Sequence, residues 1–392
     1  MKKIILFLLA LTPLVADAQF SGTGFYRAQN TDTDRYLVIV DNKSAGRVGT
    51  AGVDVKLIKA MKPFEKYVVS NPGSVCYIEQ VSKSGSTYTC NLSAQGRTLS
   101  SSNGMALKLQ GTSDPKKYKL TGSQGSYSAI ISDAYDDEDE EEITDLLVAS
   151  GERPFWNILP ITSSSACYFG VKGEVAAADG KQWTSMYAAF AFQSDNATNT
   201  KVYTISKVGN GYAALKEATG IVPKNTAVLF CCTSAAPVDN TLTLYASGGN
   251  SVGSNLLDGV YFCNDVKDSP SSDVKHRNVT YYDANTMRVL GLDSDGKPAF
   301  VKGTADNVVV GTQKGGEPGV LFLPANKAYL KVPAGSPDVI KIVTEEEYAT
   351  LGIHDILMDN KGDGRYYDLQ GRQVENPTHG LYIVNGRKVL VK

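Results

Sequence analysis

Short runs of apolar residues, separated by turn-forming residues, dominate this sequence. Between Phe20 and Ile161, the runs at 35–40, 75–81 and 86–92 mix β-branched and aromatic residues with polar ones, and an aspartate or serine follows each run. Runs of this length and composition are typical of β-strands. We therefore predict roughly ten to twelve short strands in this region, which indicates an all-β barrel or sandwich.

Two places depart from the strand pattern. Apolar residues recur at helical spacing over 53–61, and this predicts a short helix between strands. Farther along, Thr344 followed by Glu347 fits a capping box, in which each residue caps the backbone amide of the other. The box predicts a helix of one or two turns through Leu351.

A second β-rich region follows the serine-rich stretch 162–165. Two of its segments, 220–230 and 321–330, share one order: apolar residues, then Pro-x-Asn-(Thr/Lys)-Ala, then more apolar residues. Proline fixes φ and lacks an amide donor, so it suits a bend between edge strands. Because the pattern recurs about 100 residues later, we predict a duplicated β unit, with a β-sandwich-like fold.

These patterns divide the mature chain into four parts. They are a β domain at 19–161, a duplicated β-sandwich-like domain at 162–335, a linker at 336–363 and a short β-hairpin at 364–392. The fold class is therefore mainly β.

Two resemblances add to this division. The first domain loosely resembles a β-trefoil, through aromatic-and-strand units near Phe25, Tyr77 and Tyr118 and a closing segment at 155–158. The segment Pro-Ala-Asn-Lys-Ala-Tyr-Leu at 324–330 resembles one found in exported proteins of the Bacteroidetes, where it lies in β-sandwich modules of unassigned activity.

The N-terminus has the pattern of a signal peptide. Lys2 and Lys3 precede an uncharged apolar run at 4–11, and Ala16-Asp17-Ala18 has the small-x-small form that signal peptidase reads. The run is shorter than the roughly 20 residues that a transmembrane helix needs, and no later stretch is long and apolar enough to cross a membrane. We predict an exported protein, secreted or on the outer cell surface, that is cleaved after Ala18 and does not span a membrane.

Composition argues against several functions. The chain has 39 Lys and Arg residues against 41 Asp and Glu, and its basic residues are scattered, so nucleic acid is not an expected partner. Its three histidines leave little material for acid–base or metal chemistry. A run of seven acidic residues at 136–142 is predicted to be an exposed loop tip, and a calcium site is the alternative reading.

Six cysteines in an exported chain invite disulfides. Cys76 and Cys90 flank a predicted hairpin and are candidates for a cross-strand bond. Cys231 and Cys232 are adjacent, and since successive strand residues point to opposite faces, we do not expect them to bond each other. The alternative is that all six are small buried apolar residues.

The last thirty residues carry the most family-specific pattern. A strand entering a glycine turn is followed by a strand, an Asn-Gly turn at 385–386 and a returning strand; Asn-Gly suits a type I′ turn. This segment resembles the C-terminal sorting domain of Bacteroidetes type IX secretion substrates, and the resemblance implies the secretion machinery as a partner. The matching residues are Tyr367, Asp368, Leu369, Gly371, Arg372, Gly380, Tyr382 and Lys388.

A search for chemistry yields no catalytic, cofactor-binding or metal-binding residue. The segment 249–253 matches the letters of a Gly-x-Ser-x-Gly nucleophile elbow, but its flanking serines and glycine predict a loop instead. His276, His354 and His379 lie in polar segments without a paired His or Cys at ligand spacing. No cofactor is expected.

Two function classes remain. The first is a non-enzymatic binding or adhesion protein, secreted or on the cell surface, whose unknown ligand is a glycan or a host or matrix protein. The second is an extracellular hydrolase, such as a glycosidase, whose two carboxylates lie far apart in sequence. The composition and the absent motifs favour the first class.

Overall fold

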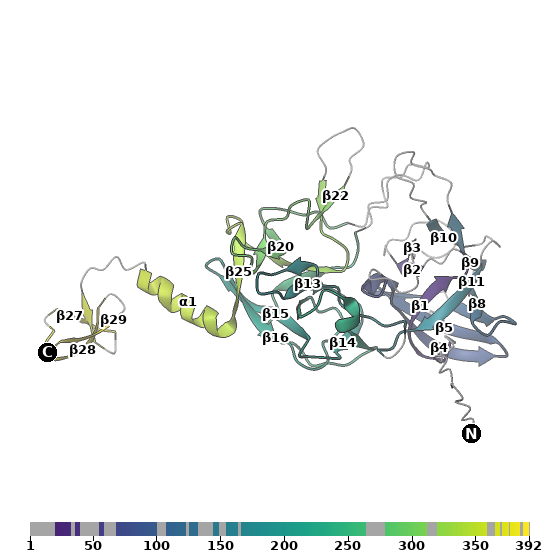
Figure 1. Cartoon of the computed structure of the whole chain (residues 1–392), viewed down its shortest axis with the longest axis horizontal. Helices are drawn as coiled ribbons and strands as arrows, with labels where there is room; N and C mark the ends of the chain where they lie inside the picture. Colours follow the sequence, from purple (N-terminus) through teal and green to yellow (C-terminus); the bar gives the residue numbers. More distant parts are fainter. Residues whose placement is uncertain are drawn as a thin grey trace, which may run out of the picture.

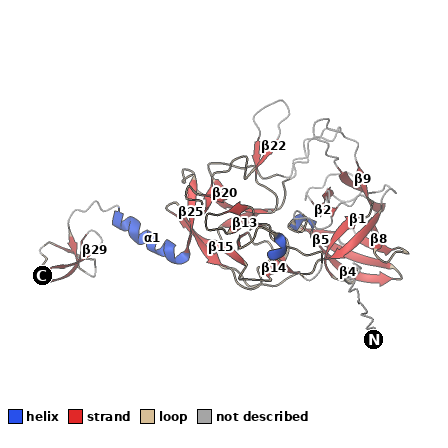
Figure 2. Cartoon of the chain, viewed as in Figure 1, coloured by secondary structure: helices blue, strands red, loops and turns tan. Residues whose placement is uncertain are grey.

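We analysed a computed structural model of the chain. It describes residues 20–32, 36–39, 55–58, 68–99, 107–122, 125–131, 144–148, 154–163, 166–263, 279–311, 320–358, 365–368, 371–375, 377–384 and 387–391. The described regions consist of strands and the loops that join them, with one α-helix and short 3-10 turns (Figure 2). The prediction of a mainly β protein is confirmed.

Six strands of the first domain close into a barrel. Each strand is hydrogen-bonded to two others of the ring, which closes where the sixth strand pairs with both the first and the fifth. In order around the barrel the strands are β1 (Gly24–Asn30), β4 (Cys76–Ser84), β5 (Thr87–Ala94), β7 (Leu107–Gly111), β8 (Lys117–Gly122) and β11 (Phe155–Pro160). Alternate residues of these strands fill the interior, including Tyr26, Ile78, Leu92 and Trp156.

The other strands that the structure describes in this domain lie outside the barrel ring. They are β2 (Tyr36–Ile39), β3 (Val55–Ile58), β6 (Arg97–Leu99), β9 (Gly125–Ile131) and β10 (Thr144–Val148). The helix predicted over 53–61 is wrong, because β3 is a strand that pairs with β2 and with β10. Pairing on both sides satisfies its backbone groups, and this tertiary context overrides the helical spacing of its apolar residues.

The second domain is built on one curled sheet of ten strands. All neighbours are antiparallel except one parallel pair, β16 with β25. The order is β12 (Val175–Ala176), β13 (Gln182–Met186), β17 (Val228–Cys232), β15 (Thr200–Gly209), β16 (Tyr212–Glu217), β25 (Val339–Thr344), β21 (Pro298–Val301), β20 (Met287–Leu292), β24 (Lys327–Lys331) and β19 (Leu257–Val260). Two small ribbons accompany the sheet: β14 (Ala191–Ser194) with β18 (Leu242–Tyr245), and β22 (Val309–Gly311) with β23 (Val320–Phe322).

Strand β17 separates two hydrophobic cores. Val228, Phe230 and Cys232 face one core, which the β14–β18 ribbon covers with Phe192 and Leu242. Leu229 and Cys231 face the other, inside the curl of the sheet. Cys231 and Cys232 therefore lie on opposite faces, as the alternation of a strand requires.

The two Pro-x-Asn segments take the same backbone conformation. Asn225 and Asn326 have φ values of 61° and 58°, in the left-handed region that asparagine tolerates better than most residues. Both meet one loop, because the Asn225 amide donates to the Ala188 carbonyl and the Tyr187 amide donates to the Asn326 carbonyl. The shared bend brings the start of β24 next to β13.

The two domains share a buried interface. Arg27 of β1 is fully buried, and its guanidinium donates to the carbonyl oxygens of Tyr168 and Val69 and to Ser74 Oγ. Tyr36, Val68 and Val75 of the first domain belong to the same core cluster as Phe169 and Phe190 of the second. Figure 1 shows the barrel and the curled sheet side by side.

The chain leaves the sheet through α1 (Glu345–Met358). Its capping box is as predicted: the Glu347 amide donates to Thr344 Oγ1 at 3.1 Å, and the Thr344 amide donates to Glu347 Oε2 at 2.8 Å. The helix extends beyond Leu351. Beyond α1 lies a small antiparallel sheet of β26 (Tyr366–Tyr367), β27 (Gln373–Val374), β28 (Gly380–Val384) and β29 (Arg387–Val391), which contains the predicted terminal hairpin (Figure 1).

Candidate functional site

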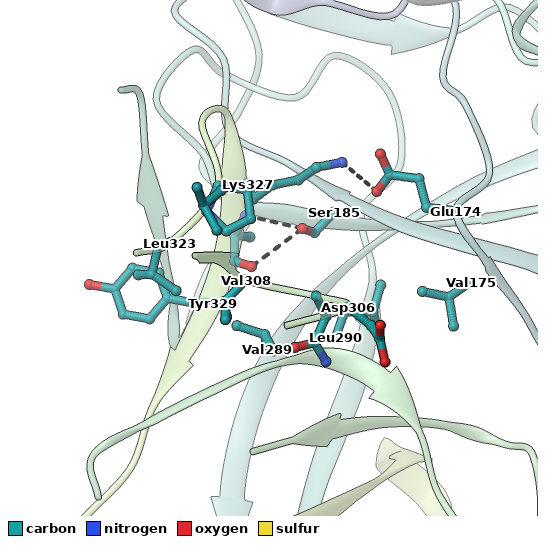
Figure 3. Close-up of a pocket in the computed structure, with 14 residues that line it drawn as sticks. Glu174, Val175, Ser185, Val289, Leu290, Asp306, Val308, Leu323, Lys327 and Tyr329 are labelled. Carbon is teal, nitrogen blue, oxygen red and sulfur yellow. Dashed lines mark hydrogen bonds and ion pairs between the residues drawn. The ribbon is translucent and has the colours of Figure 1, made fainter. Parts of the chain in front are cut away.

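A hollow of about 450 Å³ lies on the second domain between β13, β20 and β24. Its volume falls within the roughly 300–1,000 Å³ typical of ligand pockets. The walls combine aliphatic residues with a few polar ones (Figure 3). The lining residues are Glu174, Val175, Ser185, Val289, Leu290, Asp306, Asn307, Val308, Val309, Leu323, Pro324, Lys327, Ala328 and Tyr329.

An ion pair between Glu174 and Lys327 borders this hollow. Lys327 Nζ lies 2.5 Å from Glu174 Oε2, and the Thr184 hydroxyl donates to the same oxygen at 2.7 Å. Burial by itself raises the pKa of Glu174, but the charge of Lys327 and these hydrogen bonds outweigh it and hold that pKa below its ordinary value. Glu174 is therefore a carboxylate at neutral pH.

A second hollow of about 210 Å³ adjoins the first at the ion pair. Glu174, Ser185 and Lys327 line both hollows. The turn at 70–72 of the first domain lines the second hollow together with Phe169 and Met186 of the second domain. The two hollows thus adjoin each other along a line that reaches from the second domain to the first; we call them together the junction groove.

The Ser185 hydroxyl forms hydrogen bonds within the protein, whereas the Asp306 carboxylate is exposed. Ser185 Oγ accepts the Ala328 amide at 3.1 Å and lies 3.3 Å from the Ala328 carbonyl oxygen to which it donates, so it joins β13 to β24 (Figure 3). The exposed Asp306 carboxylate accepts no hydrogen bond from, and forms no ion pair with, any residue that the structure describes. Asp306 is the acid of the larger hollow that is open to a ligand.

The described residues contain no group of three or more His, Cys, Asp or Glu side chains placed to hold a metal ion. Their one α-helix is neither long nor apolar enough to cross a membrane. Segment 249–253 is a loop with positive φ at Gly249 and Gly253, not a turn between a strand and a helix. His379 is exposed on the small C-terminal sheet.

We compared the chain with known families and with curated proteins. Nothing matches.

The sorting-like residues that the structure describes lie on the C-terminal sheet and in its first turn. Tyr367 is on β26, Gly380 and Tyr382 are on β28, and Gly371 turns with φ of 82°. Arg372 Nε donates to Asp368 Oδ2 at 2.8 Å, which fastens that turn. Lys388 is on β29, and Leu369 lies outside the described residues.

The structure does not join Cys76 to Cys90. Both thiols are free and buried in the barrel interior. The register of β4 and β5 places Cys90 opposite Gln80, with a bulge just beyond it, so the two cysteines are not cross-strand neighbours. Burial raises the pKa of each thiol to about 12. Cys231 and Cys232 are also free thiols.

Several sequence predictions fall outside the described residues. Besides Leu369, they are the signal peptide through Ala18, the acidic run at 136–142, His276 and the Asn-Gly turn at 385–386.

Sequence reasoning missed Glu174 and Asp306. Neither belongs to a motif, and both lie next to turns of a kind that recurs throughout the chain. Lys327 lies within the repeated Pro-x-Asn segment, and that repetition was the one available signal.

Proposed function

We propose that this protein is an exported, non-enzymatic binding or adhesion protein, secreted or held on the outer cell surface, and that the junction groove is its recognition site. The ligand class is a glycan or a host or matrix protein. The signal-peptide pattern and the sorting-like C-terminal sheet support export and a role of the secretion machinery as partner.

The observation that carries the binding function is the state of Glu174. A hydrolase of the glycosidase type needs one carboxyl group with a raised pKa to donate a proton. In the groove, Lys327 and Thr184 act in the opposite direction and keep Glu174 ionised. Such a carboxylate accepts hydrogen bonds from a ligand but does not act as a general acid.

Hydrolysis remains the second candidate because two carboxylates, Glu174 and Asp306, line the same hollow. A screen of the full chain against glycosidic and peptide substrates, run beside a glycan array and a panel of matrix proteins, separates the two functions. Binding without turnover supports the proposal. Turnover that the Glu174→Gln and Asp306→Asn variants both abolish overturns it.

The finer fold assignments belong to the same proposal. A β-trefoil-like first domain is supported by the order of its strands: the six barrel strands are the flanks of three successive units, β1–β4, β5–β7 and β8–β11. A β-sandwich-like second domain is supported by the β14–β18 ribbon, whose Phe192 packs on Phe230 of the sheet at 5.7 Å between ring centroids. The repeated Asn225 and Asn326 bends support its internal duplication.

A further inference from the structure

We infer that the junction groove binds an extended peptide segment, and that the larger hollow takes a basic side chain of that segment, arginine or lysine. This inference rests on the proposed binding function and names its ligand class.

The charges of the larger hollow favour a cation. Its lining contains two acids, Glu174 and Asp306, and one base, Lys327. Lys327 already forms an ion pair with Glu174 and also donates a hydrogen bond to Thr184 Oγ1 at 3.2 Å. The Asp306 carboxylate is left without a positive partner among the described residues. A cationic group entering the hollow would supply that partner.

The walls favour a cation on an aliphatic stem. Val175, Val289, Val308 and Leu323 line the same hollow as Glu174, Lys327 and Asp306 (Figure 3). Lysine and arginine bury their methylene groups against apolar surface and keep their charged ends near polar groups. A compact hydrophilic cation would leave these four aliphatic walls unused.

The second hollow favours a chain over a single small amine. It continues from Ser185, Glu174 and Lys327 to the turn at 70–72, so a ligand that fills the larger hollow has room for neighbouring residues. Ser70 Oγ is buried there without a hydrogen-bond partner among the described residues, and a peptide backbone group would provide one.

The same walls argue against a glycan. The aromatic residues of the two hollows are Tyr329, which is 6% exposed, and Phe169, which is 1% exposed. Neither presents an open ring face to a sugar. The groove therefore offers aliphatic surface and one uncompensated carboxylate.

The test uses two libraries of fluorescein-labelled octapeptides with randomised flanks, which differ only in a central arginine or its neutral analogue citrulline. Fluorescence anisotropy of each library is titrated with the full chain at low and high salt. The arginine library should bind more tightly, and Asp306→Asn should weaken it about fivefold, as expected for one exposed charge pair. Asp295→Asn, which removes an exposed acid from another turn, should leave binding unchanged. Added salt should reduce the arginine preference.

Two further variants and a glycan array make the failures distinguishable. Val309→Trp adds bulk at an exposed wall of the larger hollow and should block binding of both libraries. Equal binding of arginine and citrulline peptides, still blocked by Val309→Trp, overturns the inference and leaves the binding function standing. Binding of glycans instead of peptides also overturns the inference and leaves the binding function standing. If neither peptides nor glycans nor matrix proteins bind, both the inference and the proposed function fail.

Discussion

Gln95 and Asn326 form a reciprocal pair of amide hydrogen bonds across the domain boundary. Gln95 Nε2 donates to Asn326 Oδ1 at 2.8 Å, and Asn326 Nδ2 donates to Gln95 Oε1 at 2.9 Å. Both residues are buried, and both have positive φ. Asn326 directly precedes Lys327, so the pair also fixes the start of the strand that carries the ion pair of the groove.

The Gln95–Asn326 pair should contribute measurably to stability. Gln95→Met keeps the size of the side chain but leaves the buried Asn326 amide without one donor and one acceptor. Unsatisfied buried polar groups cost about 1–3 kcal/mol, so the free energy of unfolding should fall by that amount. Urea unfolding of the variant measures it, with Gln193→Met, on the exposed side of β14, as the control. A loss no larger than that of the control would show that the pair does not stabilise the interface.

Arg27 should be among the most sensitive positions in the chain. Arg27→Met leaves the carbonyl groups of Tyr168 and Val69 and the Ser74 hydroxyl without their buried donor. We expect a loss of at least about 3 kcal/mol, measured by urea unfolding, because several buried groups lose a partner at once. Arg372→Met, whose side chain is 78% exposed, should change stability by less than about 0.5 kcal/mol. Similar losses for the two variants would contradict the interface described above.

The Glu174–Lys327 ion pair should stabilise the fold at neutral pH and lose this effect in acid. The pKa of Glu174 is lower in the folded chain than its ordinary value of 4.5, so its stabilising effect is complete above pH 4.5 and is lost as the pH falls through the folded value. The stability difference between wild type and Glu174→Gln should therefore shrink as the pH is lowered from 7 toward 3.

Thermal unfolding across that pH range measures the effect. Glu217→Gln, which removes the acid of an exposed ion pair with Lys201, serves as the control. A difference that grows on acidification would show that Lys327 does not hold Glu174 ionised.

The buried thiols should be unreactive in the native chain. Because burial raises the pKa of Cys76, Cys90 and Cys232 to about 12, little thiolate exists at pH 8. Native protein should react slowly with Ellman's reagent at these positions, and denatured protein should expose six thiols without a reductant. Fewer than six thiols in the denatured, unreduced protein would show that the chain forms a disulfide after all.

The sequence determined the local features of this protein. The capping box at Thr344 and Glu347, the opposite faces of Cys231 and Cys232, and the terminal hairpin follow from interactions among near neighbours in the chain. Alternation of apolar and polar residues was enough to establish a mainly β fold, because a strand buries every second side chain.

Only the tertiary structure decided how the strands join and where the site lies. Pairing made β3 a strand against its helical spacing, and it placed β25, expected in a linker, between β16 and β21. Glu174 and Lys327 are 153 residues apart in the sequence. Asp306, which lines the same hollow, lies in the turn between β21 and β22. Such contacts depend on register and on the closing of sheets, which are set by the packing of the whole chain and leave no local mark on the sequence.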